Sequence, residues 1–186
     1  MEDALKRLGI PKQHKILKYI GQGQNVFGLL PTGYGKNACY IIPHLLTGKN
    51  LIVISPLIAL MQDQDQSLVA HGIPSVCFNS HNPKLYGGIT GDGDMSRIRK
   101  GTLTGVLYFS PEKFLMNESF IRGLVEADSV ALVAVDEAHC VVTLADFRQC
   151  YQNLGCIRDW TTPRSSEGRQ RIPILALTAS APPPVY

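Results

Sequence analysis

The sequence predicts an α/β domain built on a mostly parallel, doubly wound sheet that is flanked by helices. Two observations lead to this prediction. Short apolar runs alternate along the chain with segments of helical character, which is the pattern of repeated strand–helix–strand units. The apolar runs are also continuous rather than alternating, which indicates strands buried on both faces, as in a parallel sheet. Functional loops should then lie at the carboxyl ends of the strands.

The first half of the chain supplies two strand–helix pairs after an opening helix. The opening helix is expected over Pro11–Ile20, and the first strand over the apolar run Val26–Leu30. A glycine-rich turn then leads into a helix over Lys36–Leu46. The next apolar run, Leu51–Ser55, predicts a second strand, and a helix over Leu57–Ala70 follows it.

The middle of the chain continues the alternation. Strands are expected over Ser75–Phe78 and Gly105–Phe109, and the Gly- and Asn-rich stretch His81–Gly93 between them is expected to form a loop. A helix is predicted over Pro111–Glu126. Ser110 before Pro111 is a good helix start, because Pro at the first helical position has no N–H that would need a partner there.

The last part adds two more strands. The run Val130–Asp136 predicts a buried strand, and Ile174–Thr178 predicts another. A helix is expected between them over Asp146–Trp160. The segment Thr161–Arg171 carries Pro, Ser, Gly and charges, which indicates a loop.

Length and composition point to one intracellular globular domain. The 186 residues, 45% hydrophobic and 18% charged, suit one domain over residues 1–181, and the Pro-rich end at 182–186 resembles a linker or a truncation point. The net charge of +3 permits nucleic-acid binding through a local patch without arguing for it. Neither a secretory signal nor an apolar run long enough to span a membrane is visible. An intracellular location is expected, nuclear in a eukaryote or cytoplasmic in a bacterium.

The five cysteines do not follow a disulfide or zinc pattern. They form no C-x-x-C pair and leave one unpaired in any disulfide scheme. Cys39, Cys77 and Cys140 lie beside apolar residues and are interpreted as buried thiols in a reducing compartment. A zinc site is not expected, since the ligand spacing is wrong.

The turn from Pro31 to Asn37 has the character of a phosphate-binding loop. Gly33 and Gly35 allow backbone N–H groups to curl around phosphate oxygens, and Lys36 adds a positive charge at the start of a helix. The strict pattern G-x-x-x-x-G-K-[ST] is not met, because Leu30 replaces its first glycine and Asn37 its final hydroxyl residue. An ordinary strand-to-helix turn is the alternative for this loop taken alone.

A pair of adjacent carboxylates, Asp136 and Glu137, ends the buried run that starts at Val130. Charge in this place is explained by a cation at the end of the strand. Asp136 could hold Mg²⁺ through water, and Glu137 could orient and deprotonate an attacking water. The alternative is a helix cap formed by Asp136. Together with the lysine loop, the carboxylate pair predicts binding of ATP or GTP.

Several motifs in the same order resemble those of RecQ-like DNA helicases, a family of DEAH-containing superfamily 2 enzymes. Asp136-Glu137-Ala138-His139-Cys140 has the form of that family's second motif, and the loop from Pro31 to Asn37 resembles its phosphate loop. The remaining matches, which extend the resemblance over nearly the whole chain, are the segments 54–64, 108–113 and 176–181. The resemblance implies the first RecA-like, ATP-binding lobe of such a helicase, with a role in DNA repair and recombination.

The resemblance also implies roles for residues at the nucleotide site. Lys36 would contact the β- and γ-phosphates, and Asp136 would hold Mg²⁺ while Glu137 acts on the hydrolytic water. Gln13 sits where the family reads adenine, which favours ATP over GTP because a carboxamide can donate to and accept from the adenine edge. The cofactors implied are ATP and Mg²⁺. The loop residues implied to surround the phosphates are Pro31, Thr32, Gly33, Tyr34, Gly35, Lys36 and Asn37, and Asn37 is also a candidate Mg²⁺ ligand.

A second implied surface binds DNA and couples its binding to the ATP site. The partners implied are single-stranded or partially duplex DNA and a second RecA-like lobe, and the motor would move from 3′ toward 5′. Thr178 and Ser180 match the motif that couples ATP state to DNA grip. The other residues implied to face DNA are Ser55, Pro56, the loop before Glu112 that contains Ser110, and Arg148, for which a surface salt bridge is an equal alternative.

Three departures from the family pattern lower the expected activity. Asn37 replaces the hydroxyl residue that ligates Mg²⁺, and the residues just before Gln13 lack the family's aromatic and Arg. The segment 141–145 is one residue shorter than in the family and has lost its Trp and His rings. In the family, the arginine that stabilises the transferring phosphate comes from a second lobe, so the resemblance implies a lobe that alone neither unwinds DNA nor hydrolyses ATP appreciably. The alternative is a degenerate, non-catalytic relative that binds DNA or a partner, and a small P-loop kinase is a poorer third reading.

Overall fold

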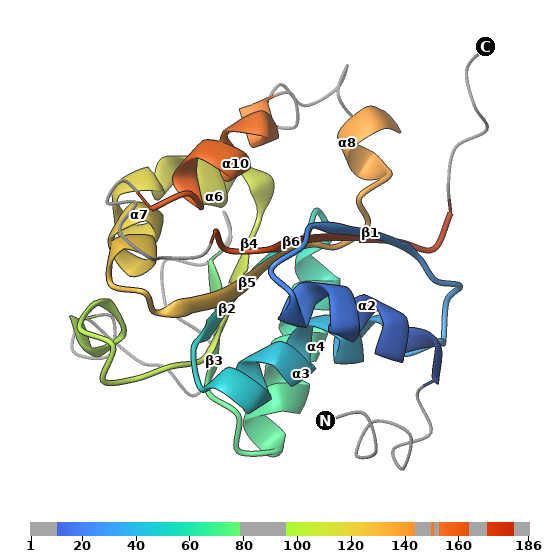
Figure 1. The fold of residues 1–186 in the computed structure, drawn as a ribbon, viewed down its shortest axis with the longest axis horizontal. Coiled ribbons are helices and arrows are strands. Elements are labelled where there is room, and N and C mark those ends of the chain that lie inside the picture. Colours follow the sequence, from blue (N-terminus) through green and yellow to red (C-terminus); the bar gives the residue numbers. More distant parts are fainter. Residues whose placement is uncertain (1–10, 79–95, 144–149, 151–152, 164–170, 181–186) are drawn as a thin grey trace.

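A computed structural model of the chain describes residues 11–78, 96–143, 150, 153–163 and 171–180. Its centre is a six-stranded sheet with the strand order β1-β6-β5-β2-β4-β3 (Figure 1). Every pair of neighbouring strands is parallel, which confirms the predicted fold class. The strands are β1 (Val26–Leu29), β2 (Asn50–Ile54), β3 (Ser75–Phe78), β4 (Val106–Phe109), β5 (Val130–Val135) and β6 (Ile174–Thr178).

Helices cover both faces of the sheet (Figure 1). One face carries α2 (Pro11–Gly21), α3 (Lys36–Thr47) and α4 (Ile58–Ala70). The opposite face carries α6 (Pro111–Met116), α7 (Glu118–Glu126) and α10 (Ile157–Trp160), preceded by the 3₁₀ turn η1 (Asn153–Cys156). The short helix α8 (Cys140–Thr143) follows β5 on this same side. Within the described ranges, no helix combines the length and the apolar character that crossing a membrane requires.

Two predicted helices differ from the structure. The single helix predicted over Pro111–Glu126 is wrong, because Asn117 separates α6 from α7. The Asn117 side chain donates to the carbonyl of Lys113 at 2.7 Å, an example of an Asn side chain competing with the helical backbone. Only part of the predicted helix over 146–160 falls in the described residues, where it is replaced by η1 and α10. The loop predicted over 81–93 lies outside the described residues.

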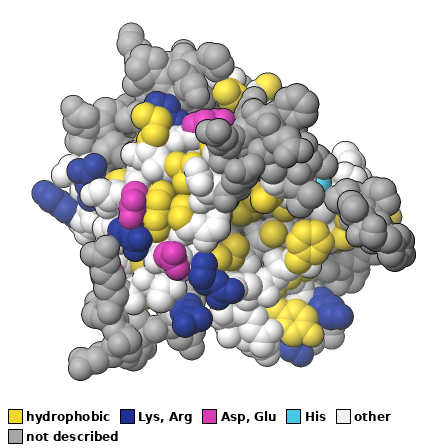
Figure 2. Space-filling view, turned by 90° about the horizontal axis from the view of Figure 1, so that it is seen from above, with side chains coloured by type: hydrophobic (Ala, Val, Ile, Leu, Met, Phe, Trp, Pro, Cys, Tyr) yellow, Lys and Arg dark blue, Asp and Glu magenta, His cyan; other side chains and the backbone are white. Residues whose placement is uncertain are grey.

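Basic and acidic side chains are mixed on the face seen in Figure 2. Over the described part of that face, Lys and Arg lie among Asp and Glu rather than in one continuous stripe, with hydrophobic side chains exposed between them. This distribution agrees with the small net charge of +3. Nucleic-acid contact through this face would therefore depend on particular residues rather than on a broad positive field.

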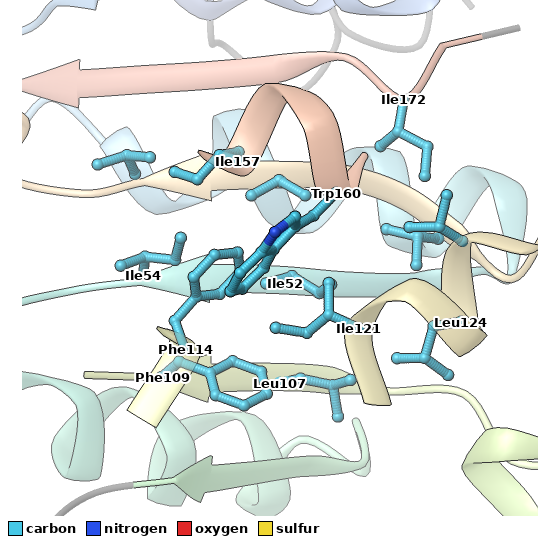
Figure 3. Close-up of a cluster of buried hydrophobic side chains, with 14 of the residues drawn as sticks. Ile52, Ile54, Leu107, Phe109, Phe114, Ile121, Leu124, Ile157, Trp160 and Ile172 are labelled. Carbon is cyan, nitrogen blue, oxygen red and sulfur yellow. The ribbon is translucent and has the colours of Figure 1, made fainter. Parts of the chain in front are cut away.

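The inner strands β2, β4 and β5 are buried on both faces, as their continuous hydrophobicity predicts, whereas the edge strand β1 leaves Phe27 and Leu29 exposed. In β2, Ile52 and Ile54 pack toward α6, α7 and α10, whereas Leu51 and Val53 pack toward α2, α3 and α4. Figure 3 shows the first of these two cores, in which Phe114 stacks on Trp160 with 5.1 Å between ring centroids. The two cores fix the strands from both sides, so the loops at the ends of the strands rest on a rigid sheet.

The register of the strands places the predicted functional loops along one edge. Leu29 of β1 pairs with Thr178 of β6, and Val135 of β5 pairs with both Ala176 of β6 and Ile54 of β2. The chain segments that follow β1, β6, β5 and β2 therefore emerge side by side at the carboxyl edge of the sheet, where open α/β sheets bind ligands.

Candidate functional site

The turn between β1 and α3 has the backbone shape of an anion-binding loop. Gly33 and Gly35 adopt φ angles of 81° and 67°, in the left-handed region that glycine tolerates best. Gly35 is the N-cap of α3, and no side chain caps the helix. The residues from Pro31 to Gly35 are exposed. The first N–H groups of α3 can therefore receive an anion from solution, helped by the positive end of the helix.

Gln13 of α2 packs against this turn and hydrogen-bonds to it. Its side chain is only 5% exposed, and its amide Nε2 donates a hydrogen bond to the carbonyl of Tyr34. A Cβ placed on Gly35 would lie 3.3 Å from the same amide nitrogen. The predicted adenine-reading residue thus lies against the predicted phosphate loop, and it holds the backbone of that loop in place.

Lys36, the first residue of α3, makes an ion pair with Glu137. Its Nζ lies 3.0 Å from Glu137 Oε1, and the two side chains are only 11% and 17% exposed. These residues are 101 positions apart in the sequence and are brought together by the parallel order of the strands. Glu137 adopts a φ of 48°, which is uncommon for a residue with a side chain and is typical of functional turns.

Asp136 is buried beside this ion pair at the end of β5. The residue is 3% exposed, and its Oδ1 accepts a hydrogen bond of 2.9 Å from the Glu137 N–H. Burial raises the pKa of its carboxyl, and the Glu137 N–H and the Lys36 ammonium offset this only in part. A cation at this point would restore the charged form, so the site fits a divalent ion held by few protein ligands.

This arrangement fits Mg²⁺ rather than a metal that needs several side-chain ligands. The described residues contain no group of three or more His, Cys, Asp or Glu that could hold a metal ion. Mg²⁺ is commonly held by one or two carboxylates, with waters and substrate phosphates completing its shell. Asp136, next to an anion-binding loop, matches that requirement.

His139 joins Glu137 to Thr178 and was given no role by the sequence analysis. Its Nδ1 lies 2.9 Å from Thr178 Oγ1 and 3.3 Å from Glu137 Oε2. Thr178 donates its own hydroxyl hydrogen to the Ser180 carbonyl at 2.7 Å and accepts from the Ser180 N–H at 3.2 Å. Since Nδ1 faces two accepting oxygens, it must carry a hydrogen. The position of His139 in the Asp-Glu-Ala-His motif was the available signal.

The other predicted residues occupy different positions. Ser55 is buried, and its Oγ accepts a hydrogen bond from the Leu57 N–H at 3.5 Å. Pro56 is half-buried. Ser110 is also buried, and its hydroxyl caps α6 by accepting from Lys113 N–H at 3.3 Å, as its position before Pro111 predicted. Arg148 lies outside the described residues.

Asn37 lines a pocket between α3 and α4. Among the described residues, no hydrogen bond joins its side chain to Asp136. Its predicted role as a Mg²⁺ ligand stays a prediction.

All three predicted buried thiols are buried, and none of them forms a disulfide. Cys39 and Cys77 are buried without disulfide partners. Burial raises the pKa of the Cys39 thiol to about 12, which keeps it protonated and unreactive. Cys140 is buried as well.

Comparison with known proteins identifies the setting of this site. The family model described as DEAD/DEAH box helicase matches residues 10–186. The chain is 37% identical over 166 residues to the ATP-dependent DNA helicase RecQ of Bacillus subtilis, covering 88% of this chain and 25% of the relative. It is 36% identical over 171 residues to the ATP-dependent helicase wrn-1 of Caenorhabditis elegans, covering 91% of this chain and 15% of the relative.

A third relative has a provisional name as an ATP-dependent RNA helicase, R290 of Acanthamoeba polyphaga mimivirus. It is 34% identical over 175 residues, covering 92% of this chain and 29% of the relative. The chain thus spans less than a third of the length of each of these relatives.

Proposed function

Because this chain belongs to the DEAD/DEAH box helicase family and resembles RecQ proteins, we propose that it is the ATP-binding lobe of a DNA-dependent ATPase that works as a 3′–5′ DNA helicase. The observation that carries the proposal is the contact of Lys36 with Glu137 next to the buried Asp136, at the mouth of a glycine turn. This group of residues contains the charges needed to bind a nucleoside triphosphate and to activate water.

The residues of the site divide the work of binding and hydrolysis. Backbone N–H groups of Gly33, Tyr34 and Gly35 would hold the phosphates, and Lys36 would exchange Glu137 for the β- and γ-phosphate oxygens. Glu137, released from Lys36, would then orient and deprotonate the attacking water. When bound through Asp136, Mg²⁺ would neutralise charge on the phosphates.

The same exchange offers a route from the nucleotide to the nucleic-acid surface. Glu137 faces His139, and His139 contacts Thr178, whose hydroxyl holds the backbone at Ser180. Loss of Lys36 from Glu137 would change the charge balance at the carboxylate that His139 contacts. We propose that Thr178 and Ser180 pass this change to bound DNA, which Ser55, Pro56 and Arg148 would help to contact.

The proposal includes a second lobe. In helicases of this kind an arginine from another lobe stabilises the transferring phosphate, and such a residue contributes several powers of ten in rate. We therefore propose that the 186 residues bind ATP but neither unwind DNA nor hydrolyse ATP appreciably without that lobe.

The test of the nucleotide site is calorimetric titration of Mg²⁺-ATP into the chain, with Lys36→Ala beside it. Binding that is lost in Lys36→Ala is the expected result. If a chain that circular dichroism shows to be folded binds no Mg²⁺-ATP, the ATP-binding lobe is refuted. A parallel titration with single-stranded DNA and RNA of the same sequence tests the substrate, since one relative is named as an RNA helicase. Tighter binding of DNA is expected.

A second candidate function is a non-catalytic module that binds DNA or a partner protein. Asn37 favours it, because an Asn stands where the phosphate-loop pattern has a hydroxyl ligand for Mg²⁺. Asn37→Ser, made in a two-lobe protein, separates the two candidates. A rise in nucleotide-dependent activity supports a motor weakened by Asn37, whereas an unchanged activity supports the binding module.

A further inference from the structure

A pocket between α3 and α4 contains a buried hydroxyl that has no partner among the described residues. Tyr108 of β4 is fully buried, and its Oη is a buried side-chain oxygen without a hydrogen bond. An unsatisfied buried polar group costs about 1–3 kcal/mol and calls for an explanation. Tyr108 lines a pocket of about 210 Å³, so a ligand in that pocket could supply the missing partner.

The pocket lies beside the phosphate loop, with which it shares Asn37. Its lining comes from α3, α4 and β4, and it does not include Lys36, Asp136 or Glu137. The α3 and α4 helices lie next to each other below the sheet (Figure 1) and are joined by a hydrogen bond of 3.2 Å from Tyr40 Oη to Gln64 Oε1. Asp63 and Ser67 are exposed at the rim, whereas Tyr108 is buried. The lining therefore extends from exposed residues at the rim to the buried Tyr108.

The lining groups favour a positively charged hydrogen-bond donor. Asp63 is the charged residue of the lining, and no Lys, Arg or His accompanies it among the residues described there. Asn37, Ser67 and Tyr108 add side-chain oxygens that can accept hydrogen bonds. Burial raises the pKa of the Tyr108 hydroxyl, and the nearby Cys77 thiol and the Asp65 and Asp136 carboxyls raise it further.

Metal binding fits this lining less well than an ammonium group does. One carboxylate is too few for a dedicated metal site, and the described residues contain no metal-binding cluster. An ammonium group carries three N–H donors and can be satisfied by one carboxylate and two neutral oxygens. Ile41 and Leu68 provide apolar walls against which methylene groups can pack.

The pocket has room for a short alkyl chain, since its volume is about 210 Å³. We propose that this pocket binds a primary ammonium on a short alkyl chain, with the ammonium between Asp63 and the Tyr108 hydroxyl. A free polyamine and the side chain of a lysine on another protein share this chemistry.

The experiment is an NMR titration of the folded chain with n-butylamine, in the absence of nucleotide and Mg²⁺. We expect a dissociation constant of about 1 mM, with shifts at the side-chain amides of Asn37 and Gln64. Asp63→Asn should weaken binding by about tenfold or more, because it removes the charged acceptor. Asp159→Asn on α10, an exposed site across the sheet, removes the same charge and should leave binding unchanged.

Further arms test the donor and the hydroxyl. 1-Butanol has the same chain without the charge, and tetraethylammonium has the charge without N–H donors, so neither should shift the same amides. Tyr108→Phe should weaken butylamine binding by about threefold or more while the chain stays folded by circular dichroism. Equal binding of butylamine to the parent chain, Asp63→Asn and Tyr108→Phe, or no binding at all, overturns the proposal.

Two larger probes distinguish a free polyamine from the lysine side chain of another protein as the natural ligand. Spermidine extends the chain with further ammonium groups, and N-acetyl-lysine methylamide attaches the same aminobutyl arm to a peptide unit. Tighter binding of spermidine than of butylamine supports a polyamine, and tighter binding of the lysine derivative supports a protein partner. Because no arm contains ATP, failure of these titrations leaves the proposed nucleotide site untouched, and the reverse also holds.

Discussion

Replacing Glu137 by Gln should make the chain bind Mg²⁺-ATP more tightly while removing hydrolysis in a two-lobe protein. The structure holds the Lys36 ammonium 3.0 Å from the Glu137 carboxylate, at the position where an arriving phosphate needs it. ATP must therefore break an existing ion pair before it can use Lys36. A Gln at position 137 keeps the size of the side chain but loses its charge, so Lys36 is released at a lower cost.

The size of the effect follows from the burial of the pair. The Lys36 and Glu137 side chains are 11% and 17% exposed, so solvent screens their attraction only in part. A hydrogen bond to a charged group contributes about 1.5–3 kcal/mol net, and a Gln carbonyl that can still accept from Lys36 keeps a share of it. The binding free energy of Mg²⁺-ATP should therefore improve by about 1.4 kcal/mol, which corresponds to about a tenfold lower dissociation constant.

The assay is calorimetric titration of Mg²⁺-ATP into Glu137→Gln, with phosphate release measured in the two-lobe protein. Glu118→Gln is the matched control, because Glu118 pairs with Arg122 at 2.7 Å on an exposed part of α7. Its ATP affinity should equal that of the parent chain. Unchanged or weaker ATP binding by a folded Glu137→Gln would refute the reasoning that the ion pair opposes ATP binding.

Three further predictions concern stability and loop shape. Burial raises the pKa of the Asp65 carboxyl in the folded chain, so protonation of Asp65 stabilises the fold. This stabilisation is complete below the pKa that Asp65 has in the unfolded chain, and it is lost as pH rises through the pKa of the folded chain. Asp65→Asn should therefore gain stability relative to the parent chain as pH rises above about 4 in urea titrations, and a pH-independent difference would contradict this. Phe114→Ala should lower the free energy of unfolding by about 3–5 kcal/mol, because Phe114 is fully buried and stacks on Trp160; a loss below about 1 kcal/mol would contradict this packing. Gly35→Ala should cost about 1–2 kcal/mol at its φ of 67° and weaken ATP binding, whereas Gly123→Ala in α7 should stabilise slightly; equal effects of the two changes in thermal melts would argue against the loop shape.

The sheet could be predicted from the sequence because each strand carries its own evidence. The continuous apolar runs predicted β3 and β6 with their observed bounds, and the other strands to within one residue at either end. The alternation with helices predicted parallel pairing, and parallel pairing predicted that Lys36 and Asp136 would meet at one edge. These inferences depend on local pattern and on general rules of topology.

The details that were missed are local features that the hydrophobic pattern does not show. Apolar spacing continues across Asn117, so the pattern did not show the break between α6 and α7. Ser110 was expected both to cap a helix and to lie near DNA; its hydroxyl forms the cap, and its contact with DNA stays a prediction. Glu137 has a positive φ that its residue type does not suggest, because the neighbouring structure imposes that conformation.

The contacts of His139 restrict how the site can respond to a nucleotide. Thr178 has already given its hydroxyl hydrogen to the Ser180 carbonyl, so it can only accept from His139. The Nδ1–H of His139 is then shared between two acceptors, Thr178 Oγ1 and Glu137 Oε2. When Lys36 leaves Glu137, that carboxylate loses a positive partner and becomes a stronger acceptor, which draws the same hydrogen away from Thr178. Binding of a phosphate at Lys36 should therefore loosen the contact at Thr178, on a neighbouring strand, without any large movement of the sheet.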